Sequence, residues 1–219
     1  MPYPITHLLI AHEILKNNDF FIENKSQFCL GSIIPDSVQF SKIYDKRISH
    51  LCNFDEEWGF ITNNEQWEKN IVDFLSMNIK SGEIDFILGY CIHILSDLNN
   101  NVKIWIPYRM KYRIFNLNDL ENHKVPNEAY NIDQELYQKN PAIFEIFELL
   151  KLSSCRNFKN LVTKEEMEQM MNNILNIQYN DKPKVNTENH KDNTYSKEME
   201  FINDCINFIN KTFSPIFQR

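Results

Sequence analysis

The chain has 219 residues, of which 42% are hydrophobic and 24% charged, and its formal net charge is −7. This length fits a single domain with a core of its own, and the ordinary hydrophobic content excludes a disordered chain. The negative charge and the absence of a basic block argue against nucleic acid and anionic membranes as partners.

The composition favours helices over sheets. Only four glycines are present, and tight hairpin turns depend strongly on glycine. Ile, Lys and Glu, which helices accommodate, are plentiful. We therefore expect an all-α protein in which residues 1–219 form one compact multi-helix bundle.

Apolar residues recur at helical spacing along most of the chain. Pro4 fits the first turn of a helix that reaches about residue 17. A short apolar segment at 28–34 ends at Pro35 and Asp36, where the proline turns the chain out of the helical region. A loop that carries His50 is expected to follow. The remaining predicted helices span 64–80, 84–100, 128–138, 141–152, 163–177 and 196–212.

Two stretches are predicted to depart from regular helix. Asn99, Asn100 and Asn101 are expected to interrupt the apolar helix, and Pro107 then fits a kinked or restarting helix. Residues 179–195 are polar and nearly free of apolar side chains, which predicts a flexible surface loop. Too little sequence follows this loop to form a second core, so it is not expected to separate two domains.

The cysteines and the N-terminal segment bear on the cellular compartment. The five cysteines are odd in number and show no Cys-x-x-Cys spacing, which argues against a disulfide framework and for a reducing compartment. The N-terminal segment lacks the basic region and the cleavage site of a signal peptide, and no apolar stretch is long enough to cross a membrane. We therefore expect a cytoplasmic protein without a transmembrane segment.

The most informative pair in the sequence is His93 and Asp97. Four residues apart on a predicted helix, they project from one face, and Gly89 one turn earlier leaves room for another chain. A His and an Asp at this spacing suit zinc or a similar ion, although a structural His–Asp hydrogen bond is the alternative. The helix is apolar on nearly every face, so an unpaired carboxylate would be costly, and this favours a bound cation.

Three further residues with metal-ligating side chains lie where predicted elements begin or end. His7 is near the start of the first helix, Asp36 follows the short apolar segment, and His50 ends a polar loop. Such positions allow separate segments to converge on one site. Taken singly, each residue has a structural alternative as a helix cap or a surface histidine, so their common order carries the prediction.

That order resembles the zinc-dependent phospholipase C-like family, whose fold also includes the S1 and P1 nucleases, and in particular its intracellular bacterial branch. The similarity covers about the first 110 residues, and the later helices match only in general character. The segments that carry it are His7, LGSIIPDS at 30–37, Lys46-x-x-Ser49-His50, LGYCIHILSD at 88–97 and VKIWIPY at 102–108.

The resemblance implies a helical bundle that hydrolyses phosphodiesters with zinc ions. Carried onto this chain, Asp36, His50, His93 and Asp97 would form one metal site, and His7, sharing Asp97, would help to hold a second ion. The family's remaining site uses a His-x-x-x-Glu pair, and none occurs here. We therefore expect one zinc ion, or two, and not a full cluster of three.

The predicted function is hydrolysis of a phosphodiester or phosphoester by a metal-activated water. Asp36, at a turn, is the residue expected to orient or deprotonate that water. Lys103 and Arg109 are candidates for contacting the phosphate. A small phosphoester or a phospholipid-like molecule is the expected substrate. The cluster of Arg109, Lys111 and Arg113 is read either as an anionic-ligand site or as a solvated helix end.

Two other kinds of helical protein use His and Asp residues at their sites. A non-catalytic metal-binding protein that keeps a reduced form of the family's site would explain the missing His-x-x-x-Glu pair. A phosphohydrolase of the HD type requires adjacent His and Asp residues, and this sequence has no such pair. A water-accessible coordination position beside a pocket would favour the enzyme over the non-catalytic protein.

Overall fold

Helices account for the regular structure of the chain. The computed structural model describes residues 2–41, 45–52, 55–123, 128–180, 182, 185, 187, 190 and 192–218. Within these residues the elements are α1 (Pro4–Asn17), α2 (Lys25–Gly31), η1 (Ile34–Phe40), α3 (Lys46–Ser49), α4 (Asn64–Asn78), α5 (Ile84–Asn100), η2 (Asn101–Trp105), α6 (Ile106–Tyr112), α7 (Leu117–His123), α8 (Glu128–Lys139), α9 (Ala142–Lys151), α10 (Lys164–Asn172), η3 (Asn173–Ile177) and α11 (Tyr195–Phe217). An isolated β-bridge between Phe158 and Val162 is the one strand-like pairing of these residues, which confirms the all-α prediction.

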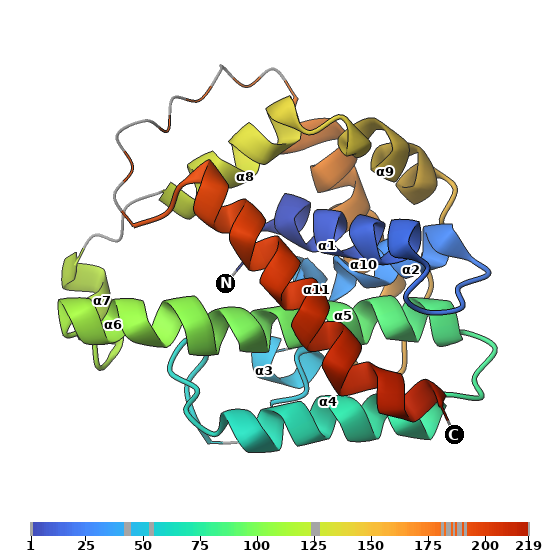
Figure 1. Cartoon of the computed structure of the whole chain (residues 1–219), viewed down its shortest axis with the longest axis horizontal. Coiled ribbons are helices and arrows are strands. Elements are labelled where there is room, and N and C mark those ends of the chain that lie inside the picture. The colour runs from blue at the N-terminus through green and yellow to red at the C-terminus, as the bar shows by residue number, and fades with distance from the viewer. Residues whose placement is uncertain are drawn as a thin grey trace.

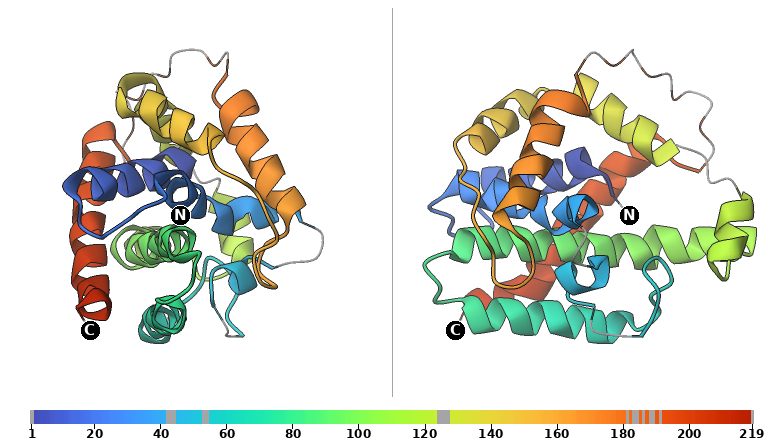
Figure 2. Two further views of the ribbon diagram at one scale, coloured as in Figure 1. Left: turned by 90° about the vertical axis from the view of Figure 1, so that its right-hand side faces the viewer. Right: turned by 180° about the vertical axis from the view of Figure 1, so that it is seen from behind.

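Helix α5 runs through the centre of the molecule (Figure 1). Helix α4 lies along one side of it, α1 and α2 lie on the other, and α11 crosses over one face. Figure 2 shows α10 on the opposite face. This surrounding explains the apolar sequence of α5, because every residue from Phe86 to Asn100 is buried and a helix buried all round must be apolar all round. His93 and Asp97 therefore lie deep in the bundle.

Helices α2 and α5 approach each other so closely that only glycine fits at the contact. A Cβ atom added at Gly89 would lie 2.1 Å from the carbonyl oxygen of Phe28, and one added at Gly31 would lie 2.2 Å from that of Phe86. The prediction that Gly89 leaves room for another chain is confirmed, and the chain that approaches is α2. The contact also brings the backbone that follows Gly31 to the face of α5 that carries His93.

The α-helix is interrupted after Asn100, as predicted, and restarts as α6 with Pro107 in its first turn. The chain continues from α5 through the π-helical turn η2 into α6. The Asn101 side-chain amide donates hydrogen bonds to the carbonyl oxygen of Ile61 at 3.1 Å and to Oδ1 of Asn64 at 2.8 Å. These bonds pair the side-chain amide nitrogen of Asn101 inside the bundle, and the π turn joins the two α-helices without a break in the helical path.

Two segments differ from the predictions. The stretch around His50 is not only a loop, because α3 occupies the turn immediately before His50; residues 42–44 and 53–54 lie outside the described residues. The sequence does not predict α7, and none of its residues is buried. Part of the loop predicted at 179–195 lies outside the described residues, and α11 begins at its last residue.

Candidate metal centre

Four acidic and histidine side chains from three segments converge on one point. Asp36, His50, His93 and Asp97 each offer a ligand atom, and these atoms all lie within 4.8 Å of one another. Asp36 lies in the first turn of η1, His50 follows α3, and the other two come from α5. The side chain of Asp36 is 13% exposed, and those of the other three are exposed by 1% or less.

Both histidines are oriented by a backbone carbonyl. Nδ1 of His93 lies 2.8 Å from the carbonyl oxygen of Ser32, and Nδ1 of His50 lies 2.8 Å from that of Lys46. A ring that donates Nδ1–H to a carbonyl presents the lone pair of Nε2 on its other side. Metal-binding histidines usually make such a hydrogen bond through the ring nitrogen that does not bind the metal. The glycine contact of α2 with α5 places the Ser32 carbonyl, and the helical turn of α3 places the Lys46 carbonyl.

The backbone at His50 is held by two aromatic side chains. Nε1 of Trp67 in α4 donates a hydrogen bond of 2.8 Å to the carbonyl oxygen of His50. The hydroxyl of Tyr90 in α5 donates to the carbonyl oxygen of Ser49. Both side chains are fully buried. The end of α3 is therefore tied to α4 and α5 at once, which fixes the distance between His50 and the α5 ligands.

Most of the converging atoms are buried and face one another without a hydrogen bond of acceptable geometry. Neither carboxylate oxygen of Asp97 and neither Nε2 atom of the two histidines makes a hydrogen bond of acceptable geometry. Burying such atoms unpartnered costs several kcal/mol. Nε2 of His50 lies 3.2 Å from Asp97 Oδ2 and 3.4 Å from Asp36 Oδ1, and Nε2 of His93 lies 3.8 Å and 3.9 Å from the same oxygens. Tetrahedral zinc ligands at 2.0–2.2 Å from the ion are about 3.3–3.6 Å apart, so the His50 distances match such an ion and the His93 distances are slightly longer.

Protonation of the cluster follows from its burial and its carboxylates. Burial lowers the pKa of His93. Burial opposes the charged form of His50 too, but contacts with Asp36 and Asp97 outweigh it and raise the pKa of His50. Burial raises a carboxyl pKa, yet Lys46 and the histidines hold the pKa of Asp36 well below its usual range, and the histidines lower the pKa of Asp97. In the metal-free chain a proton on His50 can bridge the carboxylates; a divalent ion would replace it.

His7 lies beside this cluster but is not one of its four members. Its ring stacks on that of His93 with centroids 3.7 Å apart, and its Nε2 is 3.6 Å from Asp97 Oδ1. Neither of its ring nitrogens has a hydrogen-bond partner. Burial and the adjacent His93 ring lower the pKa of His7 to about 3, so the ring is neutral and can offer a lone pair to an ion shared with Asp97.

Lys46 is a member of the site that sequence reasoning did not select. Its Nζ lies 2.6 Å from Asp36 Oδ1 and 5.4 Å from the centre of the Trp58 ring. Burial would lower its pKa, but the carboxylates of Asp36 and Asp97 outweigh burial and raise it, so the ammonium is charged. Lys46 and His50 are one helical turn apart, and this spacing is the signal that could have identified it.

The basic residues predicted to contact phosphate lie away from the four ligand atoms. Nζ of Lys103 pairs with Asp204 at 2.9 Å, and the guanidinium of Arg109 lies over the Phe60 ring at 4.7 Å. In the predicted basic cluster, Lys111 pairs with Asp192 at 2.5 Å. These contacts give each of the three side chains a structural partner in the described part of the chain.

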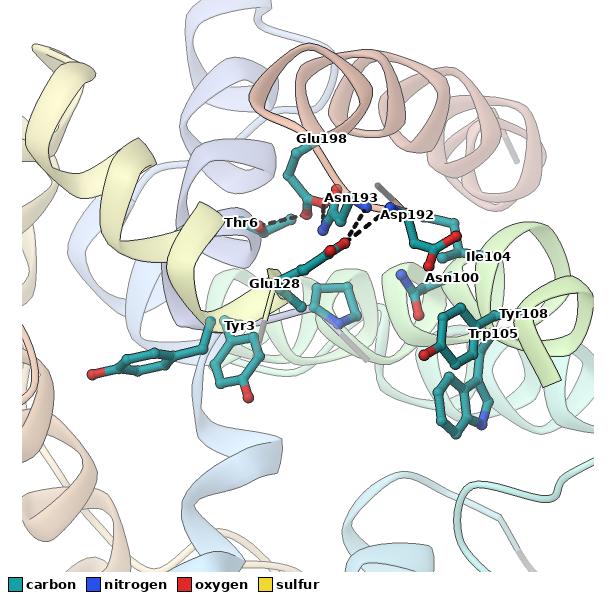
Figure 3. A pocket seen from close by; sticks show the side chains of 13 residues that line it. Tyr3, Thr6, Asn100, Ile104, Trp105, Tyr108, Glu128, Asp192, Asn193 and Glu198 are labelled. Carbon is teal, nitrogen blue, oxygen red and sulfur yellow. Dashed lines mark hydrogen bonds between the residues drawn. The ribbon is translucent and has the colours of Figure 1, made fainter. Parts of the chain in front are cut away.

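A pocket opens beside the segments of α1 and α5 that carry His7 and Asp97, and Figure 3 shows the residues that line it. Thr6, next to His7, and Asn100, three residues after Asp97, lie in its wall, but none of the four ligands does. Two pairs of aromatic rings line it, Tyr3 with Tyr130 and Trp105 with Tyr108. The carboxylates of Glu128, Asp192 and Glu198 also line it. The pocket therefore offers aromatic and acidic surface close to the candidate metal centre.

No protein-family model, no curated protein and no solved structure matches this chain. Among the described residues, no helix has the length and apolar character needed to cross a membrane. The assignment of a function therefore rests on the residues and geometry of the site.

Proposed function

We propose that the protein is a metal-dependent hydrolase of phosphoesters, with zinc held by Asp36, His50, His93 and Asp97. The observation that carries this proposal is the paired orientation of the two histidines. Each has Nδ1 against a backbone carbonyl and Nε2 facing the carboxylates of Asp36 and Asp97, and neither oxygen of Asp97 has a hydrogen-bond partner. A divalent ion bound to such a donor set lowers the pKa of a coordinated water and offsets charge on a phosphoryl oxygen.

In this proposal the four side chains have two different roles, metal binding and orientation of the attacking water. His50, His93 and Asp97 are buried and hold their positions, so they serve as fixed ligands. Asp36 is the least buried of the four ligands. In this proposal its carboxylate orients the attacking water by accepting a hydrogen bond.

The proposed substrate is a small phosphoester or a phospholipid-like molecule. The aromatic pocket gives room for the part of the substrate beyond the phosphate. We further propose a distant relationship to the zinc-dependent phospholipase C-like family, supported by the order of the ligands along the chain and by the all-α fold. A cytoplasmic location belongs to the same proposal, because all five cysteines are free thiols.

A non-catalytic metal-binding protein is the second candidate, and burial favours it. Three of the four ligand side chains are exposed by 1% or less, and no ligand lines the adjacent pocket. A site closed by four protein ligands is typically structural, whereas a catalytic site keeps a position for water. The two candidates share the metal and differ in turnover.

Hydrolysis of bis(p-nitrophenyl) phosphate by zinc-loaded protein tests the proposal. We expect activity that is lost on chelation, returns with zinc and is absent from His93→Ala. His190→Ala, a histidine outside the cluster, is the matched control and should retain zinc and activity. Full zinc loading without hydrolysis of this or other phosphoesters would favour the non-catalytic candidate. Equal and negligible zinc in wild type and His93→Ala would exclude both.

A further inference from the structure

Lys46 brings a positive charge to one edge of the ligand cluster. Its ammonium contacts Asp36 Oδ1 at 2.6 Å, while its backbone carbonyl accepts the hydrogen bond that orients His50. Its side chain extends beside Trp58, whose ring is itself 4.5 Å from the His50 ring. Lys46 therefore touches two of the four ligands and places its charge on the Asp36 side.

This edge is the least buried side of the cluster. The side chains of Lys46 and Asp36 are 31% and 13% exposed, whereas those of His50 and Asp97 are exposed by 1% or less. A ligand that approaches the cluster from this side meets the ammonium of Lys46 beside Asp36. The other ligand side chains are buried, so they are less accessible than Lys46 and Asp36.

The charges at the site favour an anion. The charges of two carboxylates cancel that of a divalent ion, and the two neutral imidazoles add none. With the ammonium of Lys46, the metal-loaded site therefore has a formal charge of about +1. The chain as a whole carries −7, so this local charge runs against the average field. A local positive charge in an acidic protein raises the concentration of anions at that place.

We propose that Lys46 is the anion-binding residue of this site and holds a phosphoryl oxygen of the ligand at the Asp36 edge. This inference rests on the proposed function and extends it to the group that recognises phosphate. An ammonium has three N–H donors, so one can remain on Asp36 while another reaches the phosphate. Lys46 thereby takes the substrate-contacting role that the sequence suggested for Lys103 and Arg109.

Binding of inorganic phosphate to the zinc-loaded full chain tests the role of Lys46. We expect Lys46→Met to keep the zinc content of the wild type but to weaken phosphate binding about ten- to a hundred-fold, the usual range for a charged hydrogen bond. Lys46→Arg should retain most of the affinity. Phosphate should also change the fluorescence of Trp58 in the wild type, and Trp58→Phe identifies that signal by removing it.

The matched control is Lys69→Met. Lys69 also pairs with an aspartate at 2.6 Å, Asp73, but on the exposed surface of α4, so phosphate binding should be unchanged. The inference is overturned if the wild type does not bind phosphate or if Lys46→Met binds it as tightly as the wild type. A parallel loss of zinc and phosphate in Lys46→Met would also overturn it, because Lys46 would then act only by holding Asp36.

The outcomes separate this inference from the proposed function. If Lys46 governs phosphate binding but no phosphoester is hydrolysed, the hydrolase proposal fails and the role of Lys46 stands. If the protein hydrolyses phosphoesters and Lys46→Met shows the wild-type KM and the wild-type inhibition by phosphate, the hydrolase stands and the role of Lys46 fails.

Discussion

The three histidines at the centre of the molecule are held in different ways. His50 and His93 are each fixed at Nδ1 by a backbone carbonyl, whereas both ring nitrogens of His7 lack a hydrogen-bond partner. A ring fixed at one nitrogen loses little freedom when the other nitrogen binds a metal. His7 is held chiefly by stacking on His93. We therefore expect His50 and His93 to hold an ion more tightly than His7 does.

Zinc stoichiometry in two histidine variants tests this difference. His93→Ala removes a member of the four-atom cluster and should abolish tight zinc binding. His7→Ala leaves the four donors in place and should keep a tightly bound ion, losing only a weaker second ion if one is present. Elemental analysis after gel filtration provides the measurement. Equal loss of tightly bound zinc in both variants would show that His7 belongs to the primary site.

The sequence predicts which side chains form the candidate metal site, but not the backbone groups that orient those side chains. The spacing of His93 and Asp97 predicts a shared face, and the structure brings Asp36 and His50 to them. The carbonyl oxygens that orient the histidines could not be predicted, because every residue has a carbonyl and only the fold selects those of Ser32 and Lys46. A hydrogen bond to a backbone carbonyl cannot be read from the sequence, because it does not depend on the type of residue that supplies the carbonyl.

Asp133 offers a pH test independent of the metal. It is buried, and its Oδ1 accepts hydrogen bonds from the backbone N–H groups of Ile5 and Thr6 at 3.0 and 3.3 Å. Burial raises the pKa of Asp133 from 3.8 to about 7, against the opposing effect of the Tyr179 hydroxyl. The carboxyl group is protonated in both states at low pH. Between about pH 4 and 7 the unfolded chain releases its proton more readily, so this group lowers stability as pH rises.

The variant Asp133→Asn removes this titration and keeps an acceptor for Ile5 and Thr6. Relative to the wild type, it should gain stability as pH rises from about 4 to 8, by at most roughly 4 kcal/mol for a shift of about three pKa units. Urea unfolding of both proteins without metal, at pH 4.5, 6 and 8, measures the difference. A difference that stays constant with pH would contradict the raised pKa of Asp133.

At the scale of elements, helices with strong periodicity could be predicted closely. The prediction of a helix from Pro4 to about residue 17 matches α1 (Pro4–Asn17), and the helix predicted at 64–80 matches α4 (Asn64–Asn78). Short elements such as α3 and α7 could not be predicted, because tertiary contacts decide a single helical turn. The run of three asparagines marks the end of α5, but the π-helical turn that follows could not be predicted, because the hydrogen bonds of Asn101 to Ile61 and Asn64 depend on the fold.

The contact of α2 with α5 should be the element contact least tolerant of added volume. A methyl group at Gly89 would lie 2.1 Å from a backbone oxygen of α2, which no rotamer change can relieve. Gly89→Ala should therefore lower the free energy of unfolding by about 3 kcal/mol or more, and displace the Ser32 carbonyl from His93. Chemical denaturation and zinc content measure the two effects.

Gly82 provides the matched control for Gly89. A Cβ atom added at Gly82 meets nothing within 4 Å. Gly82→Ala should therefore leave zinc binding intact and change stability by less than about 1 kcal/mol. Similar losses in both variants would show that glycine is needed for reasons other than the close approach of the two helices.

At the scale of the whole molecule, the candidate metal centre joins elements that are distant in sequence. Its ligands come from η1, the end of α3 and the middle of α5, and His7 adds α1. Neighbouring buried carboxylates repel each other, and a cation at their centre converts that repulsion into attraction. Bound metal should therefore stabilise the folded chain as a unit, in addition to any part that it plays in catalysis.

The melting temperature of the chain should accordingly depend on zinc. An ion that binds only the folded state at a hundred times its dissociation constant adds about 2.7 kcal/mol, which corresponds to a rise of roughly 5–10 °C for a chain of this size. His93→Ala should melt at the same temperature with zinc and with chelator, because its cluster lacks a ligand. Differential scanning calorimetry at fixed protein concentration measures both proteins. A wild type that is insensitive to zinc, or a His93→Ala variant with the full wild-type shift, would place the stabilising ion elsewhere than at these four side chains.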